Sequence, residues 1–333
     1  MSKTSLISEM LKFHFGNRVV YADGEEGYLA YVIFDPTTRQ MTHIGVKQGR
    51  FFGKTTHFPF AAVARSTREG VFLNVKRADA AAVASAEVQG AIFDQKTSVE
   101  NTSTGARGTL MLIAVHPENA ELAYLAVHNL RPGQDTFLPQ TYVIGLETGL
   151  ITIAVPEAKL KELPPYRSDD ALQQEVERIL YDFTPLHVDL KGIRARVLDG
   201  VLYLDGNISS SLRGDIARDQ VSGVAGLMEI KNNLIGDDTL AADLAMALGR
   251  DPRTRDLPIG VYPRLGVVRL SGAVHNSQQK SAADEIAKNF PGVISVINDL
   301  VVDPQADLLH VMSSSEGGEA EDKVPGKYIR HTK

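Results

Sequence analysis

The segment Asp199–Gly206 (DGVLYLDG) recurs sixty-six residues later as Leu265–Gly272 (LGVVRLSG). The offset holds without a gap beyond the motif, since Gly226 corresponds to Gly292 and apolar residues fall on apolar residues. Self-similarity at a fixed period indicates a duplicated structural unit. We therefore expect the C-terminal half to contain two copies of one module. The glycines that recur in both copies are Gly200, Gly206, Gly226, Gly266, Gly272 and Gly292.

Each copy predicts the order helix, strand, strand, helix, strand. In the first copy, Ser168 is positioned to cap a helix whose apolar residues recur at helical spacing, and two strands, a helix and a strand follow. In the second copy, Asn276 or Ser277 caps the later helix. Two helices on one face of a three-stranded sheet form a two-layer α+β module. We place the modules at residues 168–236 and 237–303.

The repeated strand and glycine, followed by a capped helix and a second glycine, carry a family resemblance. In both copies the second glycine precedes an asparagine by six positions, as Gly226 precedes Asn232 and Gly292 precedes Asn298. This pattern resembles the BON domain. The resemblance implies binding to phospholipid surfaces and, for cytoplasmic members, potassium binding or a role in stress responses. Potassium is the one cofactor that the resemblance implies, and nothing else in the chain calls for one.

The N-terminal half predicts short strands divided by Gly, Asp and Pro turns. Apolar residues follow a period near two from Val19 to Val75, which is typical of a small all-β unit. A second, weaker copy follows at an offset of 80 to 81 residues, since Asp35-Pro36 corresponds to His116-Pro117 and Phe58-Pro59 to Leu138-Pro139. We place these units at residues 12–85 and 90–160, joined by an alanine-rich connector.

The first β unit resembles a PRC-barrel. The residues that carry this resemblance are Gly16–Val20, Asp23-Gly24, Gly27, Val32–Pro36 and Phe58–Phe60. The second copy departs from the pattern, because Asn101–Gly105 replaces the acidic turn. The resemblance implies two small closed barrels that dock a partner protein. The expected fold class is therefore multi-domain, with all-β barrels followed by α+β modules.

Three further segments have their own signatures. Residues 2–14 predict a short helix with Leu6, Ile7, Met10 and Leu11 on one face, which either covers the edge of the next unit or lies in a membrane surface. Residues 156–165 (PEAKLKELPP) read as a linker. Residues 304–333 are low in hydrophobicity from Ser313 to Glu319 and predict a disordered tail.

Composition excludes several classes of function. The net charge of the 333 residues is −6, which argues against a general nucleic-acid binder. The absence of cysteine excludes disulfides, thiolate metal sites and thiol catalysis. The N-terminus has no secretory signal pattern, and no apolar run is long enough to span a membrane. We expect a cytoplasmic protein, with peripheral contact at the inner membrane face as a further option.

The best local signal for binding is a group of arginines. Arg250, Arg253 and Arg255 surround a proline, and Arg264 follows nearby in sequence. Such a group can meet phosphate headgroups, each cation near an anionic surface contributing about 1 kcal/mol. The alternative is a solvated loop in which Asp251 and Asp256 pair with the arginines. The nine histidines are scattered and predict no zinc site, and no pattern pairs a nucleophile with a base.

These observations predict a non-enzymatic scaffold. In the first hypothesis the modules of the C-terminal half contact a phospholipid surface or an ion, while the β units dock a partner protein of unknown identity. In the second hypothesis the chain is a stress-response protein that assembles with copies of itself through exposed sheet edges, or a potassium sensor, without a membrane role. Contact with RNA rests on fold analogy alone and is discouraged by the charge.

Overall fold

The computed structural model describes residues 6–49, 54–84 and 88–305. Its N-terminal half is built from strands, because apolar and polar residues alternate between short turns. The strands and helical turns of the first half are listed here in chain order: η1 Ile7–Glu9, β1 Leu11–His14, β2 Arg18–Val20, β3 Glu26–Phe34, β4 Met41–Lys47, β5 Thr55–Pro59, η2 Phe60–Ala62, β6 Val63–Thr67, β7 Gly70–Leu73, η3 Arg77–Asp79, α1 Ala80–Val83, β8 Ala91–Phe93, β9 Ser98–Asn101, β10 Arg107–Val115, β11 Leu122–Arg131, β12 Gln134–Pro139, η4 Gln140–Tyr142, β13 Val143–Glu147, β14 Leu150–Ile153 and α2 Glu157–Glu162.

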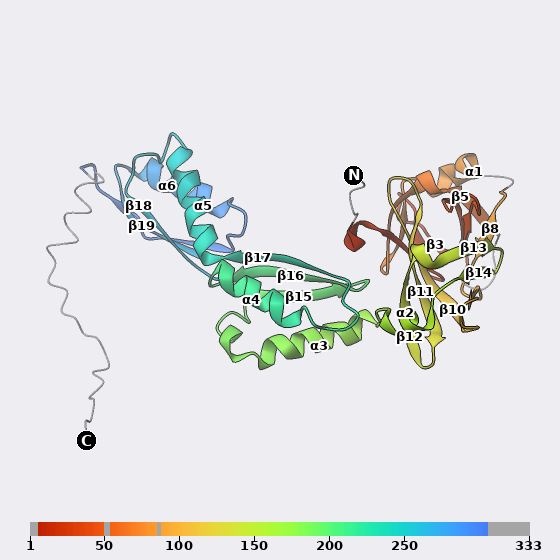
Figure 1. Cartoon of the computed structure of the whole chain (residues 1–333). Helices are drawn as coiled ribbons and strands as arrows, with labels where there is room; N and C mark the ends of the chain where they lie inside the picture. Colours follow the sequence, from red (N-terminus) through yellow and green to blue (C-terminus); the bar gives the residue numbers. More distant parts are fainter. Residues whose placement is uncertain (1–5, 50–53, 85–87, 306–333) are drawn as a thin grey trace, which may run out of the picture. The chain divides into compact units, whose positions relative to one another are not determined.

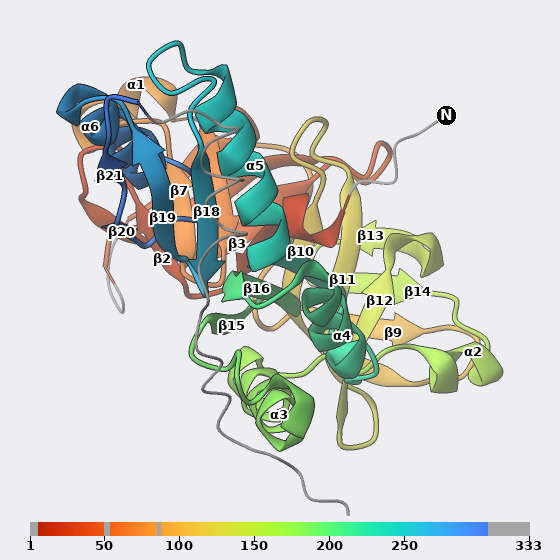
Figure 2. The same cartoon turned by 90° about the vertical axis from the view of Figure 1, so that its left-hand side faces the viewer.

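The first half forms two sheets with the same strand order. The first runs β5-β4-β3-β2-β7-β6 and the second runs β12-β11-β10-β9-β14-β13. In both, a parallel pair (β2 with β7, β9 with β14) lies among antiparallel neighbours. Figure 2 shows β2, β3 and β7 of the first sheet and β9, β12 and β14 of the second. Each position in the first sheet therefore has a counterpart in the second.

The two sheets exchange one strand each. Strand β1 precedes the first sheet but pairs with β10 of the second, placing Phe13 opposite Ile113. Strand β8 precedes the second sheet but pairs with β3 of the first, placing Phe93 opposite Val32. Both phenylalanines are fully buried. Because each sheet is completed by a strand from the other repeat, the two sheets share one hydrophobic core.

The same symmetry governs a pair of hydrogen bonds between the sheets. The amide of Met41 donates to the carbonyl of Ala120 at 2.9 Å, and the amide of Leu122 donates to the carbonyl of Arg39 at 3.0 Å. Arg39 and Ala120 both adopt positive φ, at 58° and 59°. A strained backbone of this kind persists only where the surroundings hold it. The matching contacts join the two sheets at equivalent positions.

Three expectations for this half need correction. Residues 11–14 are a strand rather than part of a helix, because Phe13 is drawn into the shared core. Among the described residues neither sheet closes into a barrel, since β5 and β6 end the first and β12 and β13 end the second. Pro59 and Pro139 end β5 and β12 and lead into short 3₁₀ turns, so the next strand forms at the opposite edge. The expected linker contains a helix, α2.

The C-terminal half contains two modules of the predicted order. Their elements are α3 Asp169–Asp182, η5 Thr184–Leu186, β15 Ile193–Leu198, β16 Val201–Ile208, α4 Ser211–Val221, β17 Glu229–Gly236, α5 Asp237–Arg250, β18 Ile259–Arg264, β19 Val267–Val274, α6 Ser277–Lys288, β20 Ser295–Asn298 and β21 Val301–Val302. Ser168 and Asn276 cap α3 and α6 as predicted. The sheets run β15-β16-β17 and β18-β19-β20, with β21 also on β19.

The chain divides into two compact units. The first holds the chain up to Thr184 with Arg194–Leu204 and Arg218–Asn232, and the second holds Pro185–Ile193, Asp205–Ala217 and the chain from Asn233. Figure 1 shows the elements in sequence colours. The predicted domain boundaries stay a prediction. The predicted disordered tail lies, from residue 306 on, outside the described residues.

Candidate functional site

The repeated motif is a tight hairpin turn held by the helix before it. Asp199 and Gly200 both have positive φ (51° and 75°), as do Leu265 and Gly266 (49° and 81°), which is the signature of a type I′ turn. Asp169, the first residue of α3, accepts hydrogen bonds from the amides of Asp199 and Gly200 at 2.9 and 3.0 Å. The other motif glycines, Gly206, Gly226, Gly272 and Gly292, also have positive φ. Their role in the described structure is therefore conformational.

The second module repeats this device. Asp237, the first residue of α5, accepts a hydrogen bond from the amide of Leu265 at 3.0 Å. Burial raises the pKa of Asp237, and its hydrogen bonds from Leu265 and Gly266 oppose that rise. The turn thus needs an aspartate on the helix, but it does not need one at its own first position, where the second copy has leucine.

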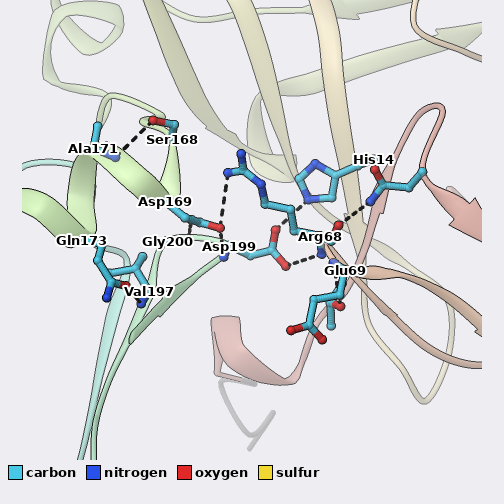
Figure 3. A network of polar contacts seen from close by, with 12 residues as sticks. His14, Arg68, Glu69, Ser168, Asp169, Ala171, Gln173, Val197, Asp199 and Gly200 are labelled. Atoms are coloured by element: carbon cyan, nitrogen blue, oxygen red, sulfur yellow. Dashed lines mark hydrogen bonds and ion pairs between the residues drawn. The ribbon is translucent and has the colours of Figure 1, made fainter. Parts of the chain in front are cut away.

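In the first module the turn begins with an aspartate, Asp199. This residue is the centre of a buried polar network (Figure 3). His14 of β1 lies 2.6 Å from Asp199 through Nε2 and Oδ1, and the amide of Arg68 donates to Oδ2 at 3.0 Å. The Arg68 guanidinium also reaches Asp169, with an N–O distance of 3.4 Å. The side chain of Asp199 is only 1% exposed. Both of its oxygens are therefore used to join the hairpin turn to β1 and to the β6–β7 turn.

A second contact lies beside the first. Glu229 of β17 accepts hydrogen bonds from the amide and hydroxyl of Ser8 at 2.8 and 3.0 Å. Lys12 is 4% exposed. Its ammonium group interacts electrostatically with Asp199, Asp169 and Glu229. Burial lowers the pKa of Lys12, and these carboxylates oppose that effect. Burial also raises the pKa of Tyr124 and Tyr166 in the same region. The buried Lys12 thus lies among carboxylates, as a desolvated charge requires.

The network makes stability depend on acid pH. Burial alone raises the pKa of Asp199, but the His14 hydrogen bond and charge, Lys12 and the Arg68 amide lower it further than burial raises it. Asp199 thus contributes stability above its unfolded pKa, about 3.9, and this stability is lost as pH falls toward the lower folded pKa. We expect urea unfolding followed by circular dichroism to show that Asp199→Asn reduces the loss between about pH 5 and pH 3. Parallel declines in the two proteins would contradict this assignment.

The predicted arginine group is only partly brought together. Arg250 ends α5, and Arg253 and Arg255 follow in the next loop, whereas Arg264 ends β18. Leu265 is hydrogen-bonded to Asp237 at the opposite end of α5, a helix of 14 residues that spans about 20 Å. Arg264 therefore lies far from the other three.

The loop arginines also differ in their partners. Arg253 binds both carboxylate oxygens of Asp251, at 3.0 and 2.9 Å, and Glu285 of α6 at 3.1 Å. These hydrogen bonds raise the pKa of Arg253 and hold the pKa of Asp251 at about 2. Arg255 is 3.9 Å from the exposed Asp256. The ion-paired alternative thus describes Arg253, while Arg250 and Arg255 carry the exposed positive charge of this loop.

The sheet of the second module has one buried and one open face. Val268 and Leu270 point into the core shared with Leu240 and Leu244 of α5 and Ala283 of α6. Residues of opposite parity point away from both helices. On that side Tyr262, Arg269 and Ile297 form one row across β18, β19 and β20, and all three are exposed.

Other residues extend this open face. Val301, opposite Ala273, is 62% exposed, and Tyr262 is 60% exposed. A hollow of about 460 Å³ beside Tyr262 is lined in part by Gly260 and Ser271. We call the residues Tyr262, Ile297 and Val301 the apolar strip. The strip was not predicted from the sequence, although the alternation of side chains along β18 and β19 indicates which residues face away from the helices.

The network around Asp199 was not predicted from the sequence either. His14 was grouped with the scattered histidines that predict no zinc site. The signal was present in the repeat itself, because an aspartate in one copy and a leucine in the other indicates a role beyond the turn. The described part of the chain contains no group of three or more His, Asp or Glu residues placed to hold a metal ion. Within that part no helix is long and apolar enough to cross a membrane.

Comparison with known proteins supports the second module. Residues 236–304 match the family model of the BON domain. The predicted first BON module at 168–236 lies outside this match, and the predicted PRC-barrels are not identified. The matched family is generally non-catalytic.

One curated protein and two solved structures are similar to parts of the chain. Osmotically-inducible protein Y of Escherichia coli is 26% identical over 159 residues, which cover 43% of this chain and 77% of that protein. CdsD, a structural protein of the type III secretion system of Chlamydia trachomatis, is 19% identical with a TM-score of 0.33, covering 40% of this chain and 62% of that chain. Its C-terminal domain gives a TM-score of 0.34 at 19% identity over 41% and 68% of the two chains. The chain thus contains one BON domain, at residues 236–304, and is distantly related to the osmotically inducible protein Y.

Proposed function

We propose that this chain is a non-enzymatic stress-response adaptor whose BON domain makes peripheral contact with an anionic phospholipid surface. The observation that carries the proposal is the apolar strip on the open face of the BON sheet. Exposed apolar side chains among cations suit the boundary between headgroups and acyl chains. The similarity to osmotically inducible protein Y supports a role under osmotic stress.

The charges around the strip support electrostatic attraction that is local rather than general. Arg264 shares the parity of Tyr262 on β18 and is exposed. Arg269 lies in the strip's row but pairs with Asp299 at 3.1 Å. Arg250 and Arg255 add charge in the loop that leads into β18. Each arginine near an anionic surface contributes about 1 kcal/mol, so the apolar strip must add to the binding.

Co-sedimentation with vesicles tests the proposal. The full chain should pellet with anionic but not neutral vesicles, and pelleting should fade as salt rises, since the Debye length falls to about 8 Å at 0.15 M. Arg255→Glu with Arg264→Glu should weaken binding at least tenfold, from about 2 kcal/mol of lost attraction. The matched control is Arg18→Glu with Arg107→Glu, which makes the same charge change in the first unit. If the full chain does not pellet with anionic vesicles at low salt, the proposed contact with lipid is wrong.

Self-association is a second candidate with its own observation. Both N-terminal sheets are open, and their end strands β5, β6 and β13 pair on one side only among the described strands, whereas the outer side of β12 is hydrogen-bonded to residues 164–166. Open edges are templates for pairing with another chain, either a partner protein or a second copy. Light scattering after size-exclusion chromatography should then show a mass that rises with protein concentration. A constant mass of 36.2 kDa would exclude this candidate over the range measured.

A further inference from the structure

The apolar strip lies next to the point where the described chain ends. Strand β21 pairs Val301 with Ala273 on β19, and Ser271, which lines the hollow beside Tyr262, is two residues from Ala273. Two residues of strand span about 7 Å. The chain therefore leaves the BON sheet beside the apolar strip.

The sequence just beyond this point is apolar. Residues 308–312 read LLHVM, with Leu308, Leu309, Val311 and Met312 as large apolar side chains, and they lie outside the described residues. The low hydrophobicity that predicted disorder begins only at Ser313. Leu308 is seven residues from Val301, which allows a reach of at most about 23 Å. This reach is several times the distance of about 7 Å between Ala273 and Ser271, which lines the hollow.

We infer that residues 308–312 dock on the apolar strip and fill the hollow beside Tyr262. Burial of apolar surface on both partners drives this contact, at about 25 cal/mol per Å². The short tether gives the segment an effective concentration in the millimolar range, which a separate partner must exceed. The hollow is also lined by Leu257 and Pro258, which offer apolar surface to the segment.

The test uses the absence of native cysteine. A nitroxide on Ser314→Cys in the full chain is the only such label, because the sequence has no other thiol. In NMR spectra of isotope-labelled protein, the amide signals of Gly260, Tyr262 and Ser271 should lose most of their intensity, relative to the reduced label. The matched control carries serine at positions 308, 309, 311 and 312 and should keep these signals. Equal losses in both proteins would overturn the inference.

A mixture separates this contact from association between copies. Spin-labelled chains without isotope are mixed with isotope-labelled chains that lack the spin label. Intact signals at Tyr262 in the mixture agree with a contact within one chain. Loss of these signals in the mixture would assign the strip to a second copy and overturn the inference.

The docked segment has a consequence for lipid binding that rests on the proposed function. Removal of residues 306–333 should expose the strip and raise binding to anionic vesicles several-fold, whereas removal of residues 313–333 should not. Equal binding of the two truncated chains, where vesicles bind at all, would overturn the docking. If neither chain binds vesicles, the proposed function fails, and the relaxation experiment still decides whether the segment docks.

Discussion

Replacing Asp199 with alanine is expected to lower the free energy of unfolding of the first unit by about 3 to 5 kcal/mol. The substitution leaves His14 and the Arg68 amide without their shared acceptor in a site where the Asp199 side chain is 1% exposed. It also places alanine at a φ of 51°, which aspartate tolerates better. Hydrogen exchange should show the loss in β1 and at the start of α3, measured against the intact chain.

Two variants separate the causes of this effect. Asp199→Asn keeps a residue suited to the left-handed backbone and one acceptor oxygen, so it should lose less stability than Asp199→Ala. Asp251→Ala breaks an ion pair on an exposed loop and should cost much less than Asp199→Ala, because solvent screens exposed ion pairs. If Asp199→Ala were as mild as Asp251→Ala, the network would have no role in holding the hairpin turn.

Replacing Phe13 with alanine should destabilise the second sheet, although Phe13 precedes the first sheet in sequence. Phe13 is fully buried and lies opposite Ile113 on β10, and truncation of such a side chain costs about 3 to 5 kcal/mol. Phe93→Ala should have the reciprocal effect on β3 of the first sheet, where Phe93 lies opposite Val32. Hydrogen exchange should become faster in β10 for Phe13→Ala and in β3 for Phe93→Ala. We call this the crossed pattern, because each substitution affects the sheet of the other repeat.

The matched control lies on the same exchanged strand. Ile92 is next to Phe93 on β8 but is 38% exposed, so Ile92→Ala should cost far less than Phe93→Ala. Faster exchange confined to β2 in Phe13→Ala, with β10 unchanged, would contradict the exchange of strands.

The sequence predicted local structure well where the interactions that determine it lie within a few residues. The strand Val267–Val274 and the caps Ser168 and Asn276 follow from alternation and from side-chain hydrogen bonding within a few residues. The helix predicted for residues 2–14 failed because the apolar residues of Leu11–His14 satisfy a strand as well as a helix. Leu11–His14 forms a strand because it pairs with β10, which lies about 100 residues away in the sequence.

The candidate sites divide in the same way. Sequence spacing grouped Arg264 with Arg250, but the intervening strand carries Arg264 to the other end of the domain. The same spacing gave no reason to join His14 with Asp199, which are 185 residues apart and 2.6 Å from each other. Contacts of this kind depend on how elements pack, and neighbouring residues do not encode that packing.

The amino-acid sequence by itself determined that the C-terminal half has the order helix, strand, strand, helix, strand twice, and that glycines set its turns. Those properties follow from backbone sterics and from the period of apolar residues, which act over a few positions. Only the tertiary structure decided which strand completes which sheet and which charges are buried together. The free energy of those choices comes from burying distant side chains such as Phe13 and Asp199, and it exists only once the chain is folded.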